Sequence, residues 1–348
     1  MNKIKVLVVD DSALVRKMLT DIIESDPQLT VVHAAKDPYE ARDYLVEHRP
    51  DVITLDIEMP KMDGVSFLKK FMRVMPTPTI IISSLAEKGK SITIEALEAG
   101  AVGIITKNKI GLSDQLESIS QDIINEIKAA AKVKLDLTKH APTETRKPSF
   151  DKAKLEETTD KVIAIGASTG GVEHLSRVLP LFPAVSPGVV IVQHMPEGFT
   201  ASFAERLNSI SQLRVKEAEH GDRILPGVAL LAPGGECHMR VVRKGGQYFV
   251  ELEAGEKVTY NRPSVDVMFD SVAEYVGKNA VCVLMTGMGK DGAKGMLNCR
   301  NKGSSTIIQS EKSCVVFGMP GEAKAIGAAE IEVDLMDIPQ IVIEKLNS

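Results

Sequence analysis

One stretch, residues 162–171, constrains the fold of this chain more than any other. It reads Val-Ile-Ala-Ile-Gly-Ala-Ser-Thr-Gly-Gly, an unbroken apolar run that ends in small residues. Such a run predicts a buried parallel strand that enters a tight turn, with a helix starting in residues 172–179. Ser168 therefore lies at the carboxyl edge of a sheet beside a helix N-terminus, where free N–H groups and the helix dipole favour negative charge. A hydroxyl at this place can attack a substrate and have the resulting oxyanion stabilised.

The length of the chain predicts two domains, because 348 residues with 44% hydrophobic content can bury two cores. The formal net charge of -5 and the lack of long basic blocks disfavour a nucleic-acid partner, since nonspecific binding depends on neutralising phosphates. Four separated cysteines without a CxxC pair favour reduced thiols in a cytoplasmic protein. We expect no signal peptide and no membrane insertion, since no apolar run is long enough to span a bilayer.

The first 130 residues alternate between predicted strands and helices. The strands are expected at 6–9, 30–34, 52–55, 79–82 and 102–105, and the helices at 14–24, 38–48, 65–74, 91–99 and 113–130. This alternation predicts an α/β fold with a doubly wound parallel sheet, which binds ligands at the carboxyl ends of its strands.

Polar residues follow four of these strands: Asp10 and Asp11 the first, Asp56 the third, Ser83 the fourth and Lys107 the fifth. In the flavodoxin-like order 2-1-3-4-5 the first and third strands are neighbours, so three carboxylates meet. Such a cluster repels itself unless a hard cation such as Mg2+ binds its oxygens. Asp56 is then a phosphoryl acceptor, Lys107 a partner for its charge, and Ser83 a donor to the new oxygens. The alternative is that the aspartate pair only caps the first helix.

This set resembles the receiver domain of response regulators over about residues 3–130. The likeness rests on the Asp10-Asp11 pair, Leu55-Asp56-Ile57-Glu58-Met59-Pro60, Met62-Asp63-Gly64, Ser83-Ser84 and Thr106-Lys107. It implies phosphorylation of Asp56 by a sensor histidine kinase. It also implies that Mg2+ is held by the aspartate pair, Asp56 and the Glu58 carbonyl.

Two positions depart from the residue pattern of that family. Asn108 replaces the usual proline after the lysine, and Ile104 replaces an aromatic residue. A cis peptide before asparagine costs about 3 kcal/mol, so we expect the loop after Lys107 to be built differently.

Apolar periodicity fades over residues 133–159, which predicts a solvated linker between domains at 1–132 and 160–348.

Two further buried strands of the second half end at chemically active residues. Residues 189–193 end at His194, and residues 281–285 run into a glycine-rich loop that holds Asp291. Strand-helix-strand units are right-handed in nearly all cases, so these strands should be parallel and end at the same edge as Ser168. The three side chains are the parts of a nucleophile, a base and an orienting acid. Backbone N–H groups at Met288 and Thr169 are candidates for the oxyanion hole.

Each of these residues also has a simpler interpretation. Ser168 could cap its own helix, His194 could be satisfied at a strand end, and Asp291 could cap the helix that begins near Ala293. Gly166-Ala-Ser-Thr-Gly170 fits G-x-S-x-G, but α/β-hydrolases follow the order serine, acid, histidine. The glycines could also cradle a phosphate, although no lysine follows as in a P-loop. A non-catalytic nucleotide- or receptor-binding output is therefore the alternative function.

The segment between residues 214 and 258 predicts short strands and tight turns. Lys244-Gly-Gly-Gln247 is a good hairpin signal, and we interpret this hairpin as a flap beside the cleft. His220 and His238 are expected to be ordinary surface or turn histidines. Ser264 is expected to cap the helix that follows it.

Five motifs of the second half resemble the catalytic domain of the chemotaxis protein-glutamate methylesterase (CheB) family, over about residues 160–340. They are Ile165–Gly171, Gln193–Thr200, Asn261–Asp266, Thr286–Gly292 and Ser313–Pro320. The family's catalytic serine, histidine and aspartate fall on Ser168, His194 and Asp291. The resemblance implies a doubly wound, mainly parallel catalytic domain with an added hairpin.

The same resemblance implies a function and its control. Glutamate γ-methyl esters on methyl-accepting chemotaxis receptors would be hydrolysed with release of methanol, and particular glutamines there deamidated, without a cofactor for ester hydrolysis. The unphosphorylated receiver would cover the catalytic cleft, and phosphorylation of Asp56 would uncover it.

Overall fold

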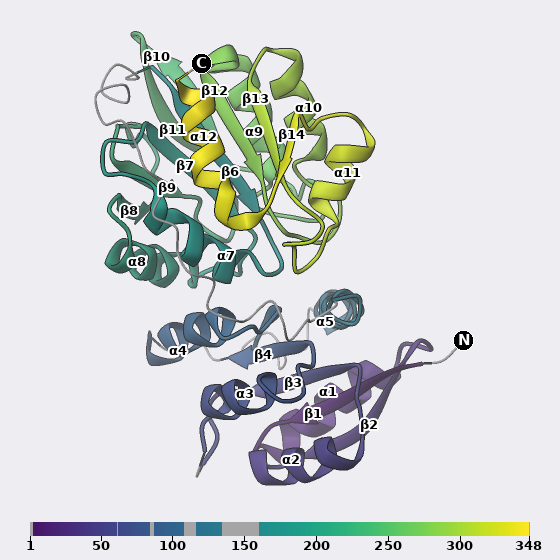
Figure 1. Ribbon diagram of the computed structural model, residues 1–348. Coiled ribbons are helices and arrows are strands. Elements are labelled where there is room, and N and C mark those ends of the chain that lie inside the picture. The colour runs from purple at the N-terminus through teal and green to yellow at the C-terminus, as the bar shows by residue number, and fades with distance from the viewer. Residues whose placement is uncertain (1–2, 61, 84–86, 108–115, 134–159, 348) are drawn as a thin grey trace. The chain divides into compact units, whose positions relative to one another are not determined.

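The computed structural model describes residues 3–60, 62–83, 87–107, 116–133 and 160–347 (Figure 1). The chain divides into two compact units, residues 1–142 and 143–348, each with its own parallel sheet. The linker predicted at 133–159 lies almost entirely outside the described residues, so its bounds stay a prediction. No helix among the described residues is long and apolar enough to cross a membrane.

The first unit is a five-stranded parallel sheet in the order β2-β1-β3-β4-β5, which confirms the predicted topology. The strands are β1 (Ile4–Val9), β2 (Leu29–Ala35), β3 (Val52–Asp56), β4 (Thr79–Ser83) and β5 (Gly103–Thr106). The helices are α1 (Ala13–Glu24), α2 (Pro38–Glu47), α3 (Gly64–Met72), α4 (Glu87–Glu98) and α5 (Leu116–Ala130). Burial of nearly every residue of β1, β3 and β4 explains their continuous apolar runs.

The second unit is a seven-stranded sheet in the order β14-β13-β12-β6-β7-β9-β8 with a separate β10-β11 hairpin. Its strands are β6 (Val162–Ala167), β7 (Gly188–Gln193), β8 (Arg214–Glu217), β9 (Val228–Leu231), β10 (Cys237–Lys244), β11 (Gln247–Ala254), β12 (Ala280–Leu284), β13 (Ser305–Gln309) and β14 (Ile331–Val333). Its α-helices are α7 (Gly171–Val178), α8 (Thr200–Ile210), α9 (Val265–Tyr275), α10 (Ala293–Asn301), α11 (Met319–Ala325) and α12 (Ile338–Leu346). Short 3-10 turns occupy Leu179–Leu181, Gly277–Asn279 and Leu335–Asp337.

The order of the strands places the functional loops together. β6 lies between β7 and β12, and all three strands are parallel. The chain builds one side of the sheet from β7 to β9 and then returns to β12 on the other side of β6. The switch point of the topology is therefore at β6, and doubly wound sheets bind their ligands at such a point, beyond the carboxyl ends of the strands.

Helix α9 fixes one face of this sheet. It packs against β6, β7 and β12, whereas α12 packs against β12 and β13 from the opposite side (Figure 1). Ser264 caps α9, as predicted, by accepting a hydrogen bond from the backbone of Val267. The apolar stripe of the helix lies fully in the core and comprises Val265, Met268, Phe269, Val272 and Val276.

Candidate active site

Ser168 directly follows β6, and its backbone is held on both sides. Its N–H donates to the Thr286 carbonyl over 3.0 Å, and its own carbonyl accepts from the Gln193 side chain over 3.0 Å. A Cβ added to Gly287 would lie 2.8 Å from the Ser168 Cβ, so the loop after β12 passes directly beside this serine. No hydrogen bond occupies the Ser168 hydroxyl among the described residues, which leaves it available for reaction.

His194 follows β7 next to Ser168 and is paired with Asp291. The backbone N–H of His194 donates to the Ala167 carbonyl over 3.1 Å, which joins the two strand ends. Its Nε2 lies 2.8 Å from Asp291 Oδ2. A carboxylate can only accept, so Nε2 carries the proton and Nδ1 carries the free electron pair. Nδ1 is therefore the nitrogen able to act as a base.

Asp291 is fully buried and accepts hydrogen bonds at both oxygens. Besides His194, its donors are the Ser264 hydroxyl at 2.7 Å and the N–H groups of Val265 at 2.8 Å, Asp266 at 3.0 Å and Gly292 at 3.1 Å. Burial alone would raise the pKa of Asp291, but the bonds from His194, Ser264 and Asp266 outweigh it and lower the pKa. The acid thus stays ionised and holds the imidazole in one tautomer.

The direction of the Met288 backbone N–H is fixed by the bonds of the peptide that it belongs to. The Gly287 carbonyl, in the same peptide unit, accepts from Gly318 over 3.1 Å and Met319 over 2.8 Å. Because the C=O and N–H of a trans peptide point in opposite directions, the Met288 N–H is turned away from the loop of residues 310–319, which we call the second loop. Neither this N–H nor that of Thr169 has an acceptor in the described part of the chain. Both can therefore bind a developing oxyanion.

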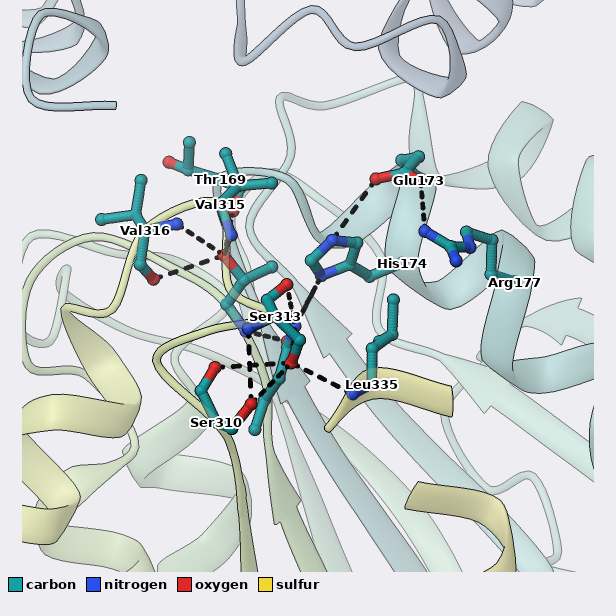
Figure 2. Close-up of polar contacts among 11 residues, drawn as sticks. Thr169, Glu173, His174, Arg177, Ser310, Ser313, Val315, Val316 and Leu335 are labelled. Carbon is teal, nitrogen blue, oxygen red and sulfur yellow. Dashed lines mark hydrogen bonds and ion pairs between the residues drawn. The ribbon is translucent and has the colours of Figure 1, made fainter. Parts of the chain in front are cut away.

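The hydroxyl of Thr286 ties the turn that follows Ser168 to the second loop. It donates to the Thr169 carbonyl over 3.0 Å and accepts from Val315 over 3.1 Å and Val316 over 2.9 Å. Figure 2 shows Thr169, Val315 and Val316 close together. The Thr286 N–H donates to the buried Gln309 side chain over 2.9 Å. This network fixes the loop around the candidate nucleophile.

A buried histidine extends this network behind the site. His174 is 3% exposed and lies between Gln309, 3.1 Å from its Nδ1, and Glu173, 3.3 Å from its Nε2. Figure 2 shows it between Glu173 and the loop, with Arg177 on the far side of Glu173. No sequence motif singled out His174, which lies within α7, or Gln309, the last residue of β13, which bonds the backbone of Thr286.

The structure contradicts the two capping interpretations, that Ser168 caps its own helix and that Asp291 caps the helix near Ala293. Helix α7 has Gly170 as its N-cap and no side-chain capping bond, so the Ser168 hydroxyl does not cap it. Helix α10 has Gly292 as its N-cap, also without a side-chain bond. Asp291 instead binds the N-terminus of α9, a different helix from the one predicted.

The sequence interpretation missed three residues around Asp291, namely Ser264 as its donor, Asp266 and His238. His238 was expected at the surface or in a turn, and this expectation is wrong, because its side chain is only 5% exposed. Its Nε2 bonds the Glu256 carbonyl over 2.8 Å, and its Nδ1 accepts from the Ser264 N–H over 3.1 Å. The clustering of Ser264 and Asp266 in one motif was the available signal.

In the first unit, the predicted acidic cluster is formed. Asp10, Asp11 and Asp56 offer oxygens that all lie within 4.8 Å of one another. The Lys107 ammonium lies 2.7 Å from Asp56 Oδ2 and 3.2 Å from Asp10 Oδ2. The alternative helix-cap role is wrong, because Ser12 caps α1.

The charges of this cluster are only partly balanced. Burial, aided by the neighbouring Asp10 charge, raises the pKa of Asp56 to about 6 despite its bond to Lys107. Burial also raises the pKa of Asp10, whose Oδ2 accepts no hydrogen bond among the described residues. Three clustered carboxylates, two of which share the Lys107 ammonium, suit a hard divalent cation with oxygen ligands.

The remaining predicted receiver residues lie nearby. The Glu58 N–H donates to Asp56 Oδ1 over 3.1 Å, so Glu58 contacts the candidate phosphoacceptor, while its carbonyl as a metal ligand stays a prediction. The Ser83 hydroxyl is buried and lies 2.6 Å from the Thr93 hydroxyl of α4. Ile104 is half-buried in β5, and Asn108 lies outside the described residues.

Comparisons with known proteins agree with this arrangement. The profile of the family described as CheB methylesterase matches residues 163–342, and that of the response regulator receiver domain matches residues 6–117. A protein-glutamate methylesterase/protein-glutamine glutaminase of Bordetella bronchiseptica is 49% identical over 350 residues, which cover 99% of this chain and 98% of that protein. A protein of the same description from Photorhabdus laumondii is 49% identical and covers 100% of this chain and 98% of its own length.

A solved structure is similar to the second unit. The crystal structure of the Thermotoga maritima CheB methylesterase catalytic domain aligns with a TM-score of 0.52 and 40% sequence identity. The alignment covers 53% of this chain and 97% of that one.

Proposed function

The chain belongs to the CheB methylesterase family, and we propose that it hydrolyses glutamate γ-methyl esters and deamidates glutamines on chemotaxis receptors through Ser168, His194 and Asp291. The observation that carries the residue assignment is the 2.8 Å bond between His194 and Asp291 at the sheet edge where β6 delivers Ser168. Both reactions need the same parts: a nucleophile, a base and an oxyanion site.

In the first half of the reaction, the Ser168 hydroxyl oxygen attacks the ester carbonyl carbon. His194 Nδ1 takes the hydroxyl proton, and the carbonyl oxygen becomes an oxyanion. When the intermediate collapses, the imidazolium gives the proton to the methoxy oxygen, so methanol leaves and an acyl-serine remains. For a glutamine substrate the proton goes to the amide nitrogen, and ammonia leaves instead.

In the second half, water attacks the acyl carbon and gives its proton to His194. The proton then returns to the Ser168 oxygen, which releases the glutamate carboxyl group and restores the enzyme. Asp291 supports both halves, because its lowered pKa keeps it ionised beside the imidazolium. The Met288 and Thr169 N–H groups are proposed to bind the oxyanion, a contribution of about 3 kcal/mol for each such donor.

The first unit is proposed to control this chemistry through phosphorylation of Asp56 by a chemotaxis histidine kinase. Asp10, Asp11, Asp56 and the Glu58 carbonyl would hold Mg2+, which neutralises charge during phosphoryl transfer. Lys107 already contacts Asp56 and would pair with the phosphoryl group, while Ser83 would turn from Thr93 toward its oxygens. The chain is proposed to work in the cytoplasm, where the receptors present their methylated helices.

The decisive experiment measures methanol release from methylated receptor. Ser168→Ala should abolish release without changing the thermal midpoint. Ser209→Ala, which removes an exposed hydroxyl from α8, should keep the full rate and serves as the matched control. Methanol release that persists in Ser168→Ala would remove the nucleophile assignment.

A second measurement separates this function from a non-catalytic binding output. A serine-directed fluorophosphonate should label the wild type and not His194→Ala, because the attack needs the base. A wild-type protein that binds receptor but resists labelling and releases no methanol would favour the binding output.

A further inference from the structure

Asp291 and Asp266 each cap the helix of the other. Asp291 lies two residues before α10, yet its carboxylate accepts from the N–H groups of Val265 and Asp266 in the first turn of α9. Asp266 is the second residue of α9, yet its Oδ1 accepts from the Gly295 N–H in the first turn of α10 over 2.7 Å. We call this exchange of carboxylates the reciprocal cap.

The reciprocal cap supplies acceptors that the helices do not provide for themselves. The first N–H groups of any helix lack intrahelical partners, and the N-cap of α10 is Gly292, which has no side chain to offer. On α9, the bond from Val267 to the Ser264 hydroxyl is long, at 3.4 Å. The two aspartates therefore satisfy N–H groups that would otherwise be buried without acceptors.

This arrangement is electrostatically costly, and the hydrolytic steps do not account for it. Asp266 is only 7% exposed and Asp291 is fully buried, so two like charges share one apolar region. Burial, followed by the charges of Asp291 and Asp270, raises the pKa of Asp266 to about 6. A buried carboxylate that touches no reacting atom and repels the triad acid needs another reason for its place.

The geometry supplies that reason. Asp291 directly precedes the N-terminus of α10, but most of its hydrogen bonds come from the N-terminus of α9. Its Oδ2 accepts from both the Val265 N–H and His194. The position of this oxygen therefore depends on how the two helix N-termini sit against each other. The Asp266–Gly295 bond is the return connection between the same two termini.

We propose that Asp266 is a positioning residue for the triad acid: its bond to Gly295 holds the start of α10 against α9, so that Asp291 Oδ2 stays directed at His194. The inference rests on the proposed function. Asp266 acts on catalysis only through Asp291, so losing it should lower kcat and leave KM unchanged.

The test compares three single variants of the full-length protein by methanol release. Asp266→Ala removes the cap and should lower kcat about 10-fold to 100-fold, the effect of misplacing a reacting group by up to about 1 Å. Asp266→Asn keeps an oxygen that can accept from Gly295 and should restore kcat to within about three-fold of wild type. Asp270→Ala is the matched control, because it removes an exposed α9 acid that bonds Asn298 of α10 over 2.8 Å, away from Asp291. It should retain the wild-type kcat.

A spectroscopic readout follows the position of the acid directly. The proton on His194 Nε2 should give a downfield resonance in the wild type and in Asp266→Asn, and a shifted or broadened one in Asp266→Ala. If Asp266→Ala does not fold, Asp266→Ser takes its place. The serine hydroxyl is bonded to Cβ rather than Cγ, so it is too short to replace the bond from the carboxylate to Gly295. The same loss of kcat is expected for it.

Two outcomes would overturn the proposal: a wild-type kcat and proton resonance in folded Asp266→Ala, or an equal loss of kcat in Asp270→Ala. Failure of the proposed function looks different. If Asp291→Asn keeps the full rate, the triad assignment itself is wrong. If Asp291→Asn is inactive while Asp266→Ala is fully active, only the reciprocal-cap inference fails.

Discussion

Replacing Gly318 by alanine tests the proposed oxyanion site most sharply, because the three atoms nearest to the added methyl group all belong to the backbone of the loop that carries Met288. It would lie 2.7 Å from the Gly287 oxygen, 3.0 Å from the Gly289 nitrogen and 3.1 Å from the Met288 Cα. Gly318 has φ -90°, a conformation that alanine adopts without strain. The effect of the substitution is therefore steric.

The size of the effect follows from these contacts. The shortest one is about 0.7 Å inside ordinary contact at 3.4 Å, and backbone atoms cannot swing aside as a flexible side chain can. The Gly287–Met288 peptide must shift, and its N–H moves with it. Loss of one oxyanion donor lowers kcat by about 100-fold to 1,000-fold, so a displaced donor should lower it by about 100-fold. Overpacking should also lower the free energy of unfolding by about 1–3 kcal/mol.

The assay is methanol release under saturating receptor, with fluorophosphonate inactivation as a second readout. Both rates should fall together while KM stays constant, because the donor acts on the transition state. Gly321→Ala is the matched control. It changes the same residue type three positions later, inside α11, and the three atoms nearest to its methyl group all belong to the Phe317 ring, the nearest at 3.1 Å. A Gly318→Ala enzyme with kcat within three-fold of Gly321→Ala would refute the assignment of the Met288 N–H.

The remaining predictions concern control and pH. Asp56→Asn should abolish stimulation of methanol release by a small phosphodonor, and surviving stimulation would place the acceptor elsewhere. A fragment of residues 155–348 should release methanol faster than the unphosphorylated full chain, and equal rates would argue against restraint by the receiver. Folding raises the pKa of Asp56 to about 6. The stability that protonated Asp56 contributes is therefore present below about pH 4 and is lost as pH rises through 6. The free energy of unfolding of the metal-free receiver should fall by about 3 kcal/mol over that range. Mg2+ should raise its thermal midpoint at pH 7 in the wild type and not in Asp11→Ala. Because folding lowers the pKa of Asp291, its stabilising contribution is complete above about pH 4 and falls below it; urea midpoints of Asp291→Asn should therefore vary less between pH 5 and 3 than those of the wild type.

Much of the fold could be predicted because the relevant signals are local. Continuous apolar runs marked β6, β7 and β12 as buried parallel strands, and the residues after them had to reach one edge of the sheet. The order of the first sheet followed from strand-helix alternation together with the acidic residues at its strand ends. The hairpin turn at Gly245 and Gly246 was visible as a pair of adjacent glycines.

Other features could not be predicted from pattern alone. The alternative interpretation of Asp291 was a cap of the helix near Ala293, but the helix N-terminus that Asp291 binds is that of α9 rather than α10. His238 has no distinguishing neighbours in the sequence, and only the packing of the hairpin against α9 buries it beside Ser264. Gln309 became visible only when its strand was placed beside β12.

The sequence by itself determined which chemical groups end the strands and at which edge they emerge, since side-chain periodicity, glycine turns and crossover handedness are properties of short segments. Only the tertiary structure decided which nitrogen of His194 faces Asp291, where the Met288 N–H points and which donors surround the buried acid. These directions depend on contacts such as that between Asp266 and Gly295, which are 29 residues apart. Contacts of this kind form only when complete helices pack against each other, so no local pattern encodes them.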